Sequence, residues 1–267
     1  MFTQSNFGVV TKMGIWLMPE PPGYKPFMIT YQREEDLEAI FEITRPLKVN
    51  QIIPNAAVAV DLLWEASAKT TRRHYFDGKG PLPQSARTRI ASDLDLGMWN
   101  YYGALYGPPP VIANNWKIVE DALMSIPGAK LYLDRENDPA WDYRVRLMRG
   151  EPNMTEFSIM NWIGGGGHVN FSPISAPSGA EALAQYTMIK RRCHEYGFDY
   201  IGEFLVGWRD MHHILMIMYD RADEAMRKSA YDLFGLLVDE AAEGGFGEYR
   251  THLAFMDQIA KTYKHLS

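Results

Sequence analysis

Runs of β-branched and apolar residues alternate along this chain with stretches in which apolar residues recur every three or four positions. The second half shows the pattern most clearly. It predicts strands over 168–174, 199–208 and 211–220, helices over 179–196 and 222–243, and a short return at 246–250. Ser178 and Glu181 form a capping box for the first of these helices, and Gly197 is a good stop for it. The resulting β-α-β-β-α-β order is typical of a ferredoxin-like unit.

The first half follows a similar order less clearly. The pattern predicts strands over 7–18, 26–32, 97–107 and 129–134, with helices over 33–44 and 112–126. Pro46 should stop the first of these helices, residues 56–67 fit either a strand or a helix, and 68–83 resemble an exposed loop. We therefore predict an α+β fold. Its two ferredoxin-like units join into one large antiparallel sheet, and helices cover one face.

Composition narrows the class of protein. The chain has 267 residues, 46% of them hydrophobic, which is enough for a sizeable core. Its single cysteine, Cys193, lies on the apolar side of a helix and favours a reducing, cytoplasmic setting, and the first ten residues lack the features of a signal peptide. No run reaches the ~20 apolar residues of a membrane span. The net charge of −6, without a basic stripe, argues against a nucleic-acid partner.

Two histidine patterns raise the question of chemistry. Four glycines precede His168 in "IGGGGHVNFSP", but a strand follows them and the GK[ST] ending is missing, so this is not a phosphate loop. His168 is then either an ordinary hydrogen-bonded histidine or a functional one. His212 and His213 are adjacent on a strand and point to opposite faces, so they cannot chelate one ion, and we predict no metal site.

Two further groups stand out. Tyr249 and Arg250 follow a glycine-rich turn at a strand-to-helix junction, where Thr251 is a possible cap. Such a junction can bind an anion, but the arginine can also be a structural partner of a carboxylate. Glu203 shares an apolar strand face with Ile201 and Leu205. A carboxylate in such a place is either paired with an arginine or has a raised pKa and a chemical task.

Five segments together resemble the vanillyl-alcohol oxidase and p-cresol methylhydroxylase flavoprotein family, with bacterial eugenol oxidase, a 4-phenol oxidase, as the nearest likeness. They are "SNFGVVTKMGIWLMP", "NYYGALYGP", "HVNFSPI", "MHHI" and "GEYRTHLAFMDQI". The resemblance runs from Phe2 to about Tyr263, and the last segment is the most specific. It implies that residues 1–18 are the tail of an FAD-binding domain. Residues 19–247 would be the cap or substrate domain, in halves of about 19–150 and 151–247, and 248–267 the truncated start of a return segment.

The same resemblance assigns roles to single residues. It implies that His168 is the covalent attachment point of FAD and that the glycines before it let the flavin approach the backbone. Tyr249 and Arg250 would bind the phenolate, with Arg250 also next to the cofactor, and Glu203 would orient or activate a water molecule. The backbone at Gly8 and Val10 would contact FAD, and the substrate side of the pocket would include Tyr200, Glu156 and Ile214.

The implied function is flavin-dependent oxidation of para-substituted phenols such as eugenol or vanillyl alcohol. Hydride would pass from the α-carbon of a bound phenolate to FAD through a quinone methide, and O2 would be reduced to H2O2. Most of the FAD-binding domain is missing from these residues, so we expect the chain alone to be inactive, with an apolar docking seam. The family also implies a homodimer. The alternative is a non-catalytic fragment or an aromatic-ligand-binding module that needs a separate FAD-domain chain.

Overall fold

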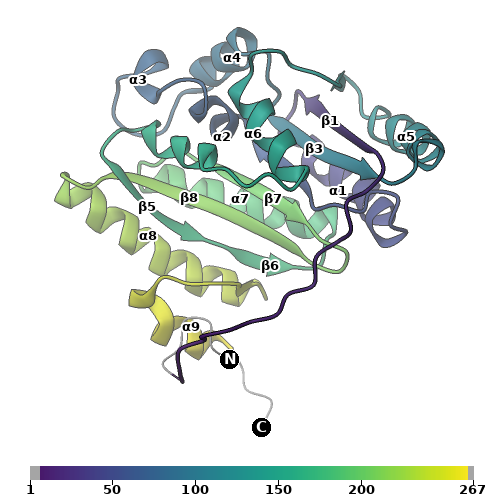
Figure 1. Ribbon diagram of the computed structural model, residues 1–267. Coiled ribbons are helices and arrows are strands. Elements are labelled where there is room, and N and C mark those ends of the chain that lie inside the picture. The colour runs from purple at the N-terminus through teal and green to yellow at the C-terminus, as the bar shows by residue number, and fades with distance from the viewer. Residues whose placement is uncertain (1–6, 264–267) are drawn as a thin grey trace.

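In the computed structural model, which describes residues 7–263, one antiparallel sheet runs through the whole protein (Figure 1). Its strands follow the order β4-β1-β3-β2-β7-β8-β6-β9, and β5 also pairs with β8. The strands are β1 (Tyr24–Tyr31), β2 (Ala57–Asp61), β3 (Trp99–Tyr106), β4 (Lys130–Tyr132), β5 (Gly166–Phe171), β6 (Pro173–Ser175), β7 (Gly202–Val206), β8 (Met211–Asp220) and β9 (Gly247–Glu248).

Helices lie between these strands. They are α1 (Asp36–Val49), α2 (Leu62–Ser67), α3 (Arg72–Tyr75), α4 (Gln84–Asp93), α5 (Pro109–Leu123), α6 (Pro139–Met148), α7 (Gly179–Glu195), α8 (Glu224–Glu243) and α9 (Met256–Thr262), with 3-10 turns η1 (Thr155–Asn161) and η2 (Leu253–Phe255). Ser178 caps α7 by accepting from the Glu181 N–H, and Gly197 follows its end with a φ of +82°. The predicted helix start at Ser178 and the glycine stop are therefore confirmed, but only half of the capping box forms, because the Ser178 N–H donates to the Ala176 carbonyl instead of to Glu181.

The strand order repeats itself. In the first half, β4-β1-β3-β2 is the 4-1-3-2 order of a ferredoxin-like unit, and β9-β6-β8-β7 repeats it when β5 and β6 count as one interrupted strand. The halves join where β2 pairs antiparallel with β7, with Val60 opposite Glu203. The predicted α+β fold of two ferredoxin-like units in one large sheet is confirmed.

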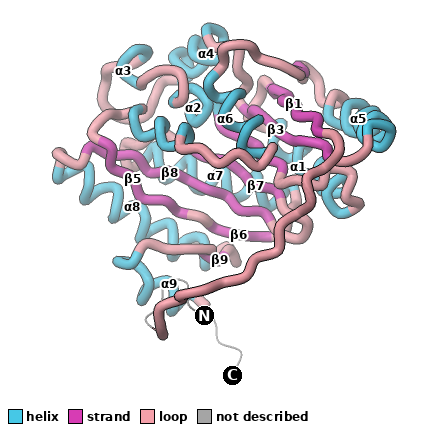
Figure 2. The backbone as a smooth tube through the Cα atoms, in the orientation of Figure 1, coloured by secondary structure: helices cyan, strands magenta, loops and turns pink. Residues whose placement is uncertain are grey.

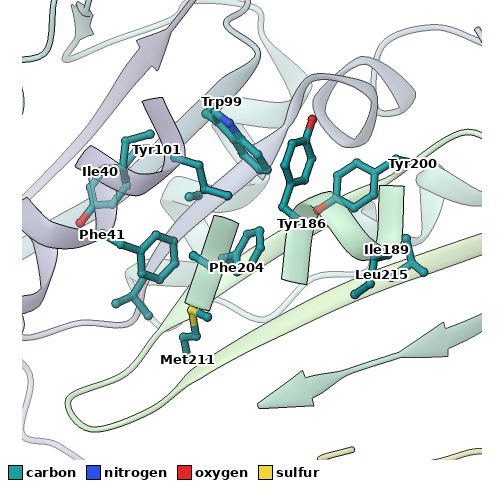
Figure 3. Close-up of a cluster of buried hydrophobic side chains, with 14 of the residues drawn as sticks. Ile40, Phe41, Trp99, Tyr101, Tyr186, Ile189, Tyr200, Phe204, Met211 and Leu215 are labelled. Atoms are coloured by element: carbon teal, nitrogen blue, oxygen red, sulfur yellow. The ribbon is translucent and has the colours of Figure 1, made fainter. Parts of the chain in front are cut away.

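One face of the sheet is covered by α1, α5, α7 and α8. Between them lies an aromatic core that Figure 3 shows in part. Ring centroids are 5.5 Å apart for Phe41 and Phe204, and 5.1 Å apart for Trp99 and Tyr186, both in edge-to-face geometry. Such contacts add to the stabilisation that burial of the rings provides. Cys193 is fully buried in this core, as its position on the helix predicts.

The other face is covered only in its central part. There α2, α4, α6 and η1 bury a second apolar cluster, and Figure 1 shows α6 in front of the sheet. The prediction that helices cover one face was therefore incomplete, because the long connection between β2 and β3 and the segment before β5 also fold onto the sheet. The part of this face formed by β5, β6 and β8 lies beside that cover and carries the candidate site.

Three local predictions were wrong. Residues 7–18 form no strand. The segment from Phe7 to Glu20 is exposed, and Figure 2 shows it as a loop, because no neighbouring strand pairs with it in the described part of the chain. Helix α1 continues through Pro46 to Val49, since Leu47 and Lys48 are buried in its last turn. The predicted loop at 68–83 contains the short helix α3.

Candidate functional site

His168 lies on β5 opposite Met218 of β8. The neighbouring Val169 points into the helix-covered core, so by alternation His168 faces the other side of the sheet, together with Asn170. The imidazole is half-buried, and this burial lowers its pKa below the usual value. A neutral imidazole at this place can act as a nucleophile or a hydrogen-bond partner.

The glycines before His168 have a structural explanation of their own. Gly164, Gly165 and Gly166 have φ of +81°, +74° and +63°, a region that favours glycine. A Cβ on Gly165 would come within 2.2 Å of the Asp220 carboxylate, and one on Gly167 within 2.5 Å of the Tyr219 ring. The turn and its packing on β8 therefore already require glycine at these positions.

Tyr249 and Arg250 follow β9 and lie next to the sheet face that carries His168. The Arg250 guanidinium lies 5.3 Å from the centroid of the Tyr249 ring. The centroid of the His212 ring lies 4.4 Å from that of the Tyr249 ring. His212 is hydrogen-bonded to Asp210 at 2.7 Å, whereas His213 is buried on the opposite face, as alternation predicts. The adjacent cap is His252, whose Nδ1 accepts from the Ala254 N–H, rather than Thr251.

An open hollow of about 410 Å³ brings several of these residues together. Its lining consists of His168, Val169, Asn170, Ser172, Ile214, Tyr249, Arg250, Thr251 and His252. The volume lies within the range of small-molecule sites. The neutral imidazole, the phenol and the guanidinium thus border one space, although about 80 residues separate the histidine from the other two in sequence.

Glu203 lies opposite Ile214 in the β7–β8 pairing, so it shares the face of the hollow. It is buried and accepts a hydrogen bond from Arg144 Nη2 at 3.1 Å. Burial raises its pKa to about 7, although Arg144 opposes this shift. Glu203 is therefore paired with an arginine and has a raised pKa as well. Glu156 of η1 is close enough for its charge to raise the pKa of Glu203 further.

Tyr200 is not part of the hollow. Its ring lies in the helix-covered core, 4.9 Å from the Tyr186 ring, and Figure 3 shows the two side by side. Its hydroxyl is 2.7 Å from Nε2 of the buried His213. The expected place of Tyr200 on the substrate side is therefore wrong, because residues 200 and 203 differ by an odd number and face opposite sides of the strand.

Gly8 and Val10 belong to the exposed N-terminal segment. Eight large apolar side chains of this segment are more than half exposed: Phe7, Val9, Val10, Met13, Ile15, Trp16, Leu17 and Met18. Such a concentration of exposed apolar surface is unusual for a soluble chain and marks a contact region. Residues 1–6 and 264–267, which the expected domain division includes, lie outside the described residues.

Sequence reasoning missed three residues of the site region. Arg144 lies on α6, next in space to Glu203, and Glu65 lies on α2. Ser172 lies between the end of β5 and the start of β6, and it lines the hollow. A signal existed for Arg144, because "AWDYRVRLM" places it three residues after Trp141 on an otherwise apolar helix side. Such an arginine needs a buried carboxylate.

Among residues 7–263, no group of three or more His, Cys, Asp or Glu residues is arranged to hold a metal ion. No helix there is long and apolar enough to cross a membrane.

The double ferredoxin-like sheet and a hollow bordered by histidine, tyrosine and arginine define a domain that can hold an aromatic or anionic ligand. The sequence profile described as FAD linked oxidases, C-terminal domain, matches residues 49–267. The chain therefore belongs to the FAD-linked oxidases and represents their C-terminal domain, and FAD is the cofactor of this family.

Within this family the chain is similar to proteins that act on phenols. It is 41% identical over 98% of its length to the flavoprotein subunit of 4-cresol dehydrogenase (hydroxylating) from Pseudomonas putida, of which it covers 51%. The crystal structure of p-cresol methylhydroxylase with substrate bound matches 98% of the chain with a TM-score of 0.94 and 40% identity, over 52% of that protein. The isoeugenol complex of 4-ethylphenol oxidase from Gulosibacter chungangensis matches 93% with a TM-score of 0.89 and 36% identity, over 49%.

These matches confirm the resemblance to the p-cresol methylhydroxylase family. The chain spans about half the length of the curated 4-cresol dehydrogenase subunit and of both solved structures.

Proposed function

We propose that this chain is the substrate domain of a flavin-dependent oxidase of para-substituted phenols, of the type that acts on eugenol or vanillyl alcohol. The observation that carries the proposal is the shared hollow of His168, Tyr249 and Arg250. Relatives whose names refer to 4-cresol and 4-ethylphenol support the class of substrate.

The residues around the hollow fit FAD. His168 is neutral and accessible, so it would carry the covalent bond to the cofactor, while Arg250 and the backbone at Gly8 and Val10 would contact it. When bound, FAD supplies a hydride acceptor that O2 can reoxidise with release of H2O2. The exposed apolar segment that contains Gly8 and Val10 would then be covered by an FAD-binding domain.

The phenol would be held at its oxygen. Tyr249 would donate its O–H to the phenolate, and the Arg250 guanidinium would add a charge-assisted hydrogen bond. Stabilising the phenolate directs electron density to the para carbon, so that a hydride can leave the α-carbon and the substrate becomes a quinone methide. The two side chains are already in contact, so little further ordering is needed.

The rest of the pocket would bind the para substituent. Ile214 offers an apolar wall, and Glu203 opposite it would orient or activate the water that adds to the quinone methide. Glu156 would lie on the same side. The Tyr200 ring, buried under the helices, has no part in substrate binding in this proposal.

The domain division proposed here keeps the boundaries expected from sequence: 1–18, 19–247 and 248–267. The resemblance to the p-cresol methylhydroxylase family also leads us to propose a homodimer. The alternative is a non-catalytic fragment or aromatic-binding module that needs a separate FAD-domain chain. The oxidase and this alternative differ in whether activity appears in one chain or only after two chains are mixed.

The test begins with expression of the chain with excess FAD, alone and together with an FAD-binding domain. The protein is denatured in acid, and the flavin absorbance that stays with the polypeptide is measured. Oxidation of 4-ethylphenol, eugenol and vanillyl alcohol is followed by O2 consumption. The chain alone should be inactive. When the chain is joined to an FAD-binding domain, we expect retained flavin and turnover that are lost in His168→Ala but kept in the exposed control His74→Ala.

Each result has a defined meaning. Retained flavin and turnover in one covalent chain support the oxidase. Activity that appears only on mixing two separately made chains supports the alternative. If the protein retains flavin but oxidises none of the three phenols, with either O2 or a soluble electron acceptor, the proposed function is wrong.

A further inference from the structure

A buried ionic cluster lies on the same face of the sheet as the hollow, where α2, α6, β3 and β7 meet. Arg144 of α6 donates from Nε to Glu65 Oε1 at 3.0 Å and from Nη2 to Glu203 Oε2 at 3.1 Å. Glu65 also accepts from the Tyr102 hydroxyl at 2.8 Å. All three charged side chains are less than one-tenth exposed. One guanidinium therefore bridges two carboxylates in a place that water barely reaches.

The geometry of Arg144 is fixed on all sides. Its guanidinium lies 5.0 Å from the ring centroid of Tyr102 and 5.0 Å from that of Tyr143, in addition to its two ion pairs. A planar guanidinium that is both forked and stacked has little freedom to turn. Glu203 is therefore held in one orientation on the face of the sheet that carries Ile214 and the hollow.

The charges of this cluster do not balance. Glu65 and Glu203 contribute two negative charges when ionised, and Arg144 contributes one positive charge. The other groups that face Glu203 are Glu156 of η1, which adds negative charge, and Tyr143 of α6, whose phenol is neutral because burial raises its pKa well above the usual value. Because like charges in a buried place disfavour full ionisation, the cluster stabilises one proton on its carboxylates.

The two carboxylates are not equally satisfied by hydrogen bonds. Glu65 is the better satisfied carboxylate, since it accepts from both Arg144 and Tyr102, whereas Glu203 has the Arg144 bond and the nearby charge of Glu156. We propose that Arg144 is a positioning residue that holds Glu203 in one orientation on the face of the sheet that carries the hollow, and that Glu65, by sharing this arginine, makes Glu203 the carboxylate of the cluster that takes up and releases a proton. The inference rests on the proposed role of Glu203 toward water and assigns its regulation to two residues outside the pocket.

The test measures the proton on Glu203 directly. In the FAD-loaded holoenzyme labelled with ¹³C-glutamate, the infrared band of the protonated carboxyl is followed with pH and assigned by its loss in Glu203→Gln. Three variants are compared: Glu65→Gln, Arg144→Gln and Arg144→Lys. Arg87→Gln is the matched control, because Arg87 is equally buried but pairs with Asp61 at 3.0 Å and with Glu34 at 3.5 Å instead of with Glu65 and Glu203.

We expect Glu65→Gln to move the titration to lower pH by about one unit, because Arg144 then serves Glu203 alone; one unit is a tenfold change in the ionised fraction. Arg144→Gln should move it upward by at least as much, Arg144→Lys should fall between, and Arg87→Gln should leave it unchanged. The pH profile of kcat for 4-ethylphenol should shift in the same direction as the titration of the carboxyl band, while KM changes less.

The inference is overturned if Glu65→Gln and Arg144→Lys both leave the titration of the Glu203 band where it is in the parent protein. These two conservative variants decide the question even if Arg144→Gln does not fold. Because the band is measured without turnover, a shift in an enzyme that oxidises no phenol would reject the proposed function and keep the assignment of the cluster.

Discussion

The backbone N–H of Tyr249 donates to the carbonyl oxygen of Ser172 at 2.8 Å. The N–H of Ser172 in turn donates to both carboxylate oxygens of Glu248, at 3.1 and 3.0 Å. These bonds tie the segment that carries Tyr249 and Arg250 to the junction that follows His168. Two parts of the proposed site that lie far apart in sequence are thereby held together by the backbone of Ser172 and the carboxylate of Glu248.

The carboxyl of Glu248 should make stability depend on pH. Burial raises its pKa from 4.5 to about 8, and its backbone partner at Ser172 only partly opposes this. Since the folded state then binds the proton more tightly than the unfolded state, this contribution is full below pH ~4.5 and is lost as pH rises toward ~8. We expect Glu248→Gln to flatten the decline of Tm between these values in thermal unfolding scans. An equally steep decline in the variant would contradict the assignment.

Asp199 should be a strong determinant of stability. Its carboxylate accepts from Arg72 Nε at 2.9 Å, from the Leu82 N–H at 2.7 Å and from Trp162 Nε1 at 3.1 Å, and so anchors the 68–83 segment to the sheet. Asp199→Ala leaves these donors without an acceptor and should lower the free energy of unfolding by about 3 kcal/mol.

Urea unfolding measures the loss, and Asp77→Ala is the control. Asp77 pairs with Arg73 at 3.1 Å on the exposed surface, so this variant should change the free energy of unfolding by less than about 0.5 kcal/mol. Similar losses in both variants would show that burial of the Asp199 pair has no special weight.

The glycine turn should respond unequally to alanine. Gly165→Ala combines a φ of +74° with a Cβ only 2.2 Å from Asp220, whereas Gly164→Ala has a φ of +81° and open space. We expect Gly164→Ala to cost about 1 kcal/mol of unfolding free energy from backbone strain. Gly165→Ala should cost about 2 kcal/mol more, because the neighbouring strand must shift. Equal costs in chemical denaturation would show that the close contact with Asp220 relaxes freely.

Tyr249 and Arg250 should control phenol binding. In the FAD-loaded holoenzyme, Tyr249→Phe removes one donor and should raise the Kd of a phenolic inhibitor about tenfold. Arg250→Met removes the charge and should raise it by about 100-fold, because hydrogen bonds to charged groups are stronger. Titration calorimetry checks both values. Tyr132→Phe, which loses a hydroxyl bonded to Asp95 at 2.7 Å elsewhere, should leave the Kd unchanged.

Much of the fold could be predicted from short-range patterns. The capped start of α7 at Ser178, its end before Gly197 and the burial of Cys193 each depend on residues within a few turns of one another. The β-α-β-β-α-β order of the second half was likewise visible, and with it the fold class. The opposite directions of His212 and His213 followed from strand alternation alone.

Other features depended on which distant segments meet, and local patterns do not contain that information. Alternation places Tyr200 and Glu203 on opposite faces but does not say which face has the hollow; that depends on where α6 and η1 fold. The apolar run at 7–18 has the composition of a strand but no partner strand in the described chain.

The sequence by itself determined most of the helices and strands and singled out the candidate residues His168, Tyr249 and Arg250, because periodicity and motifs are read from neighbours along the chain. Only the tertiary structure decided that these three border one hollow and that Arg144 is shared between Glu65 and Glu203. The physical reason is that a buried charge finds its partner through the packing of separate elements, and this packing is set by the register of the whole sheet.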